Sequence, residues 1–177
     1  MSYVELIVVL SIFAVLSSVV IFNYGAFQDR VDIKNLASDI ALKIVEAQKS
    51  SINGVLPFGY SYDPATWKPS YGVSFDISTP KQFIYFVDLT NLGDRTSLDT
   101  INITKNNSIS KIENCSIEPC ELSAPTINSL SVSFQRPNSG AIFTGVIIAK
   151  YVQITIMSPK GATALIKVYP SGRVQVN

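Results

Sequence analysis

The chain has 177 residues, with 14 Lys and Arg, 13 Asp and Glu, and no His. This length predicts one domain, and the lack of His excludes a Ser-His-Asp or Cys-His nucleophile and any His-ligated metal. Two cysteines are too few for a four-cysteine zinc site. Charged residues make up only 15% of the sequence, against about 25% in a typical soluble domain.

The apolar excess lies at the start of the chain. The run from Leu6 to Phe22 contains no charge, Pro or Gly, and its length is near the lower limit for crossing a bilayer core of roughly 30 Å. Glu5 stands at the edge of this run, where an ionisable side chain is costly. One interpretation is a plain signal anchor, and the other is a functional carboxylate. No basic residue precedes Arg30, which disfavours a secretory signal.

An amphipathic segment follows. Between Val31 and Ile52 the apolar residues recur with the 3.6-residue period of a helix, and Asn53-Gly54 provides a stop signal. We therefore expect one helix from near residue 1 to about Asn53, roughly 80 Å long. Asn23 and Gly25 are weak helix formers between its two halves, so we expect the helix to bend or melt there.

Short β-type runs separated by Pro, Gly, Asn and Ser fill the rest of the chain. The last three runs (146–157, 164–168 and 173–176) predict an antiparallel meander. We expect an α+β fold in which a protruding hydrophobic helix (1–27) precedes a globular head (28–177). The head would comprise an amphipathic helix (28–53), a connecting loop (54–70) and one antiparallel sheet (71–177), with the helix packed on the sheet.

The two cysteines, Cys115 and Cys120, are separated by four residues. This spacing differs from the C-x-x-C redox motif and favours a structural disulfide in an extracytoplasmic domain. Closing so small a loop would stabilise the fold by about 2 kcal/mol. Two free thiols or a redox pair are the alternative.

Charge is distributed unevenly along the chain. Residues 123–177 contain no Asp or Glu, whereas residues 1–122 are net acidic. This asymmetry predicts either contact with nucleic acid or membrane, or a self-complementary subunit that builds open filaments. The basic residues concerned are Arg136, Lys150, Lys160, Lys167 and Arg173.

The first residues, MSYVELIVVL, resemble the mature N-terminus of type IV pilins and pseudopilins. In that family a prepilin peptidase removes a basic leader, the new first residue is N-methylated, and the fifth is Glu. The resemblance implies that Met1 is the processed N-terminus and that Glu5 pairs with the amine of a neighbouring subunit. It also implies the long helix and sheet of the pilin fold, and a filament core packed by Leu6, Val9, Leu10, Phe13, Leu16 and Val20.

The closing strands resemble the GspH/FimT-like pilin group. Some members of that group carry a Gly-Arg-x-Arg element linked to DNA binding, but here the sequence is Gly172-Arg173-Val174-Gln175. The second Arg is missing, which weakens the case for DNA. Many type IV pilins also have Pro at position 22, where this chain has Phe22.

The resemblance implies a structural subunit of a type IV pilus that assembles as a helical homopolymer on the bacterial surface. Its partners would be other copies of itself, the inner membrane before assembly, the prepilin peptidase and the pilus assembly platform. The alternative is a minor pilin or pseudopilin of a type II secretion or DNA-uptake system, with DNA or a host surface as a further partner. We expect no cofactor, no metal and no enzymatic activity.

Overall fold

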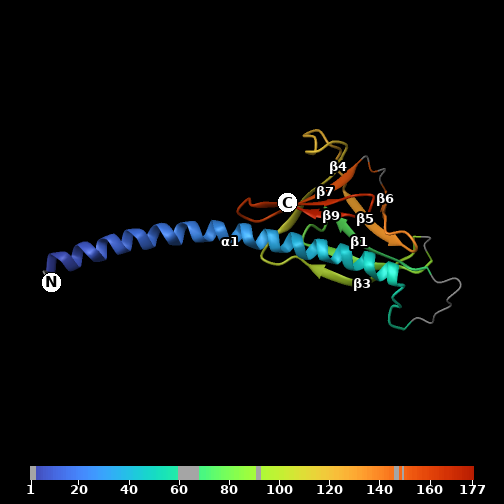
Figure 1. The fold of residues 1–177 in the computed structure, drawn as a ribbon, viewed down its shortest axis with the longest axis horizontal. Coiled ribbons are helices and arrows are strands. Elements are labelled where there is room, and N and C mark those ends of the chain that lie inside the picture. Colours follow the sequence, from blue (N-terminus) through green and yellow to red (C-terminus); the bar gives the residue numbers. More distant parts are fainter. Residues whose placement is uncertain (1–2, 60–67, 91–92, 146–147, 149) are drawn as a thin grey trace.

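The computed structural model describes residues 3–59, 68–90, 93–145, 148 and 150–177. Within these ranges the chain forms a single helix and nine strands. The helix, α1 (Tyr3–Asn53), extends far beyond the strands at its N-terminal end, and its second half lies against them (Figure 1). Along α1 the side chains of residues 19–23 and 26 lie outside the description.

The second half of α1 is helical because its apolar residues fall on one stripe. Ile33, Ala37, Ile40, Ile44 and Ala47 are spaced by three or four residues and are fully or almost fully buried, as the helical period requires. The helix ends where Gly54 adopts a positive φ of 60°. The N–H groups of Gly54 and Val55 bond to the carbonyls of Ser51 and Ser50, which is the Schellman pattern that satisfies the last carbonyls of a helix.

The nine strands form two antiparallel sheets. The five-stranded sheet has the order β3-β2-β1-β5-β6. Its strands are β1 (Ser70–Asp76), β2 (Gln82–Asp88), β3 (Arg95–Asn102), β5 (Ser129–Gln135) and β6 (Ala141–Thr144). The four-stranded sheet has the order β4-β7-β8-β9, with β4 (Ser108–Cys115), β7 (Tyr151–Met157), β8 (Thr163–Val168) and β9 (Val174–Val176).

The predicted fold class, a pilin fold with a helix on one antiparallel sheet, is therefore wrong. The strands form two sheets where one was predicted. β1 pairs with β5, which is distant in sequence, and β4 pairs with β7 instead of with a strand of the first sheet. The predicted meander of the last three runs is confirmed, since β7, β8 and β9 pair in sequence.

Both sheets and the helix share one hydrophobic core. The first sheet contributes Val73 and Val132, and the second contributes Ile154 and Ile166, all fully buried against the α1 stripe. Figure 1 shows α1 crossing in front of both groups of strands. Since the helix contacts β1, β5, β8 and β9, it holds the two sheets together and fixes the direction in which its first half leaves the head.

The predicted disulfide between Cys115 and Cys120 is confirmed. It closes a short loop directly after β4, and Cys115 is fully buried beside Tyr151 and Tyr169. The bond therefore fixes the end of β4, where Cys115 pairs with Tyr151 of β7.

Candidate assembly surface on the N-terminal helix

The first half of α1 presents apolar side chains to its surroundings on every side. Every side chain from Tyr3 to Leu16 is exposed. The residues predicted to pack in a filament core are between 50% and 69% exposed, and these are Leu6, Val9, Leu10, Phe13 and Leu16. The side chain of Val20 lies outside the description. An exposed apolar area of this extent marks an interaction surface.

The sequence predicts a membrane anchor over residues 1–27. Within the described part of the chain, no helix is both long enough and apolar enough to cross a membrane.

Glu5 lies on the same face as three aliphatic side chains. Together with Leu6, Val9 and Leu10 it lines a shallow groove of about 450 Å³ on the helix surface. Positions three and four residues apart share one side of a helix, so Val9 lies beside both Glu5 and Leu6, and Leu10 lies beside Leu6. If another chain covered this groove, the carboxylate would lose its water and would need a cation beside it. Met1, the predicted source of that cation, lies outside the described residues.

One serine hydroxyl near this end bonds within its own helix. The Ser11 hydroxyl donates to the Val8 carbonyl at 2.8 Å. Within the described ranges, no group of three or more His, Cys, Asp or Glu side chains could hold a metal ion.

α1 runs without interruption through Asn23 and Gly25, where a bend was expected. Lys160, from the turn between β7 and β8, lies against the helix here and pairs with Asp29 at 2.9 Å. A Cβ atom added to Gly25 would lie 3.8 Å from the Lys160 ammonium. This contact marks where the head begins, and melting of the helix on assembly stays a prediction.

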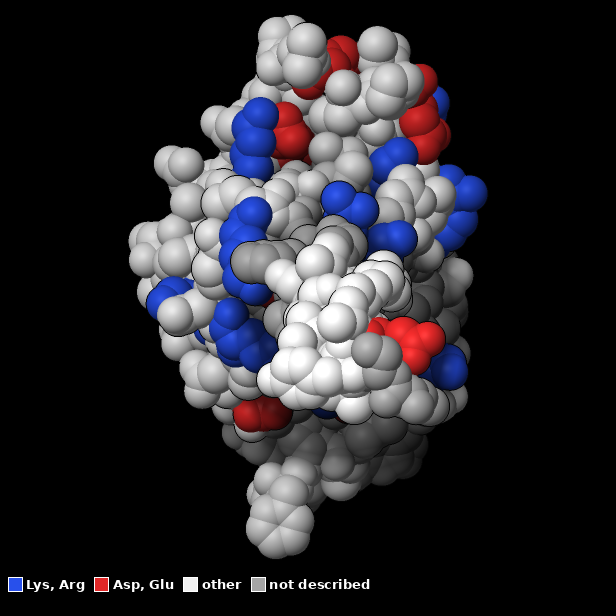
Figure 2. All heavy atoms as spheres, turned by 90° about the vertical axis from the view of Figure 1, so that its left-hand side faces the viewer, with Lys and Arg blue, Asp and Glu red and all other residues white. Residues whose placement is uncertain are grey.

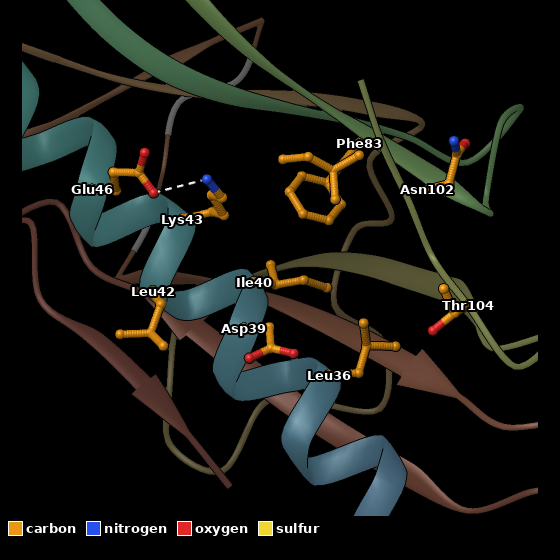
Figure 3. Close-up of a pocket in the computed structure, with 10 residues that line it drawn as sticks. Leu36, Asp39, Ile40, Leu42, Lys43, Glu46, Phe83, Asn102 and Thr104 are labelled. Carbon is orange, nitrogen blue, oxygen red and sulfur yellow. Dashed lines mark ion pairs between the residues drawn. The ribbon is translucent and has the colours of Figure 1, made fainter. Parts of the chain in front are cut away.

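A second groove lies beside the helix on the head. It has a volume of about 420 Å³ and is bounded by α1, Phe83 of β2 and the end of β3 (Figure 3). On its rim, Lys43 and Glu46 form an ion pair at 2.9 Å, and the hydrogen bond to Glu46 raises the pKa of Lys43. No pattern in the sequence predicts this groove, because its walls on α1 and β3 come together only in the folded chain.

Three of the five basic residues of the acid-free region, Lys150, Lys167 and Arg173, lie close enough to Glu118 to lower its pKa. Lys167 is buried and pairs with Glu118 of the disulfide loop at 2.7 Å. Arg173 places its guanidinium 3.9 Å from the centre of the Tyr169 ring. Arg136 lies close to Gly54 at the end of α1, and Ser139 of the same turn approaches Gly172, the residue before Arg173. Contact of these basic residues with nucleic acid stays a prediction.

The pair of Lys167 and Glu118 stabilises the charged form of both groups. The hydrogen bond from Lys167 lowers the pKa of Glu118, and the same bond raises the pKa of Lys167. Lys150 and Arg173 also lower the pKa of Glu118 through their charge. Lys150 itself is exposed, and Lys160 is paired with Asp29 at the base of the head.

Comparison with known proteins gave no relative: no family model, no curated protein and no solved structure matches this chain.

Proposed function

We propose that this chain is a structural subunit that polymerises into a helical surface filament of the type IV pilus kind. The observation that carries the proposal is the contrast between the two halves of α1. The second half is buried against its own sheets, whereas the first half leaves large apolar side chains such as Val9, Leu10 and Phe13 more than half exposed. Only another molecule can cover them.

The free energy available from covering this surface is large. Fully burying one large apolar side chain is worth about 1.5–3 kcal/mol. Leu6, Val9, Leu10, Phe13 and Leu16 retain between 50% and 69% of their exposure, so burying all five would contribute roughly 6 kcal/mol per chain. A bundle of such helices, each offset along the axis, repeats one head-to-tail contact and therefore grows as an open filament.

Glu5 supplies the register in this proposal. Within a helix bundle its carboxylate is costly unless a cation lies beside it, and the resemblance implies that the cation is the N-terminal amine of a neighbouring subunit. A charge pair in an apolar seam is satisfied at only one axial offset. The aliphatic residues Leu6 and Val9 tolerate many offsets, so Glu5 selects one of them.

In cells the proposal places the filament on the bacterial surface, after processing by a prepilin peptidase and with the help of an assembly platform. The test is electron microscopy of sheared surface filaments, with this chain as the main band. Wild-type chain and the control Glu46→Gln should both give filaments, because Glu46 lies on the head half of α1. Glu5→Gln should assemble poorly.

The two parts of the proposal fail separately. If wild-type chain is expressed and folded but forms no filaments, the proposal that it polymerises is wrong. Normal filaments from Glu5→Gln would leave the polymer standing and overturn the register role of this carboxylate.

A further inference from the structure

A groove at the base of the head joins the two halves of α1. It has a volume of about 520 Å³ and lies between the helix and the turn that connects β7 to β8. Its apolar lining includes Phe27, Val31 and Ile33 from α1 and Ala162 from the turn. Phe27 is 63% exposed while Ile33 is almost fully buried. The groove therefore leads from the exposed apolar helix into the core of the head.

Two cations border this groove. Arg30 and Lys34, one helical turn apart on α1, both line it and are exposed. The nearby acids Asp29 and Asp32 are already paired with lysines, Asp29 with Lys160 at 2.9 Å and Asp32 with Lys105 at 2.8 Å. The positive charge of Arg30 and Lys34 therefore remains uncompensated within the described part of the chain.

Cations lie at several places on the face around the helix, with acids among them (Figure 2). Figure 2 views the molecule from its N-terminal side, and Lys and Arg side chains lie on both sides of the protruding helix. An anion approaching along the helix would meet positive charge where the apolar part ends and the head begins.

The backbone of the turn offers little to a peptide. The Gly161 N–H bonds to the Ser158 carbonyl at 3.0 Å, and the Ala162 N–H bonds to the Ser158 hydroxyl at 3.0 Å. A peptide main chain laid in the groove would leave its own polar groups without partners, which is costly. A hydrocarbon chain has no such groups and suits an apolar lining.

We propose that this groove binds the headgroup end of an anionic phospholipid. The phosphate lies at Arg30 and Lys34, and the upper part of an acyl chain lies against Phe27, Val31 and Ala162. The volume is within the range of sites for small molecules, and an anionic head with an apolar tail matches the two parts of the lining. The groove is complete within one chain, so the inference does not depend on filament assembly.

The test is flotation of the full chain with phospholipid vesicles. Vesicles of phosphatidylcholine alone measure the contribution of the apolar helix, and vesicles that also contain phosphatidylglycerol add the anionic headgroup. Two cations near an anionic surface should strengthen partitioning by roughly 30-fold at low salt, and high salt should remove most of this gain. Equal partitioning of wild-type chain into both kinds of vesicle would overturn the proposal.

Matched variants locate the effect. Arg30→Gln with Lys34→Gln should abolish the gain from phosphatidylglycerol and leave binding to phosphatidylcholine unchanged. The control, Lys49→Gln with Lys150→Gln, removes the same charge from two exposed sites. Lys49 is about 22 Å along α1 from Lys34, and Lys150 precedes the far end of β7. If the control lost as much of the gain from phosphatidylglycerol, the effect would come from overall charge, and the proposal of a lipid site in this groove would be refuted.

A third variant tests the groove without changing any charge. Ala162→Trp should fill it and reduce the gain from phosphatidylglycerol, while the circular dichroism and the Cys115–Cys120 disulfide stay as in wild type. If the folded Ala162→Trp chain retained the full gain, the lipid would bind elsewhere and the proposal would fail.

Discussion

Replacing Phe13 by Ala tests whether the exposed half of α1 drives assembly. Phe13 is 69% exposed in the isolated chain and lies outside the core of the head, so the stability of the head should not change. Fully burying a Phe is worth up to about 3 kcal/mol. Covering the exposed 69% of this side chain should therefore contribute about 2 kcal/mol per subunit.

Loss of about 2 kcal/mol should raise the critical concentration for assembly roughly 30-fold. The assay is sedimentation of purified chain after removal of detergent, over a series of total concentrations. Phe58→Ala is the matched control, because Phe58 is fully exposed and follows the end of α1 on the head. An unchanged critical concentration for Phe13→Ala, or an equal rise for Phe58→Ala, would refute the reasoning.

Three further predictions concern the head, each measured by urea unfolding. Ile44→Ala should lower the free energy of unfolding by about 2–5 kcal/mol, because Ile44 is fully buried in the core and its truncation leaves a cavity. A decrease below about 1 kcal/mol would contradict this packing. Burial raises the pKa of Tyr71 from 10.0 to about 12, so stability that is complete below pH 10 should fall by up to about 3 kcal/mol as pH rises towards 12. Tyr71→Phe should lose the bond to the Val55 carbonyl and flatten this alkaline loss, and an unchanged slope would count against the assignment. Cys115→Ser with Cys120→Ser should lower the free energy of unfolding by about 2 kcal/mol, and reduction of the wild-type chain should lower it by the same amount. An unchanged urea midpoint would show that the disulfide does not stabilise the fold.

The positions of the helix and of its buried face could be predicted from the sequence. Ile33, Ile40 and Ile44 recur at helical spacing, and spacing alone places them on one face because a helix has a fixed period. Gly54 marks the end of α1 because a residue without Cβ adopts the positive φ that a Schellman motif needs.

The division into two sheets could not be predicted in this way. Alternation in β1 and β4 shows that both are strands, but it carries no information about the partner. Ser70 of β1 faces Gln135 of β5, and Cys115 of β4 faces Tyr151 of β7. Such pairings depend on the packing of the whole core and on contacts between residues far apart in sequence.

One candidate surface can be predicted from the sequence and the other cannot. Glu5 and the apolar residues around it follow from the sequence, because the helical period alone brings Glu5, Leu6 and Val9 together. The grouping of the basic residues in space does not follow from the sequence. Lys167 and Arg173 lie six residues apart, yet one is buried against Glu118 and the other lies over Tyr169.

The sequence by itself determined the composition of this protein's exposed helix: an apolar run edged by one carboxylate, followed by an amphipathic segment. Those features depend on residues within a few turns of one another. Tertiary structure alone decided that two sheets share one helix, and that Arg30 and Lys34 border a groove closed by the turn around Ala162. The physical reason is that such a groove needs two segments more than 120 residues apart, which only the folded core brings into contact.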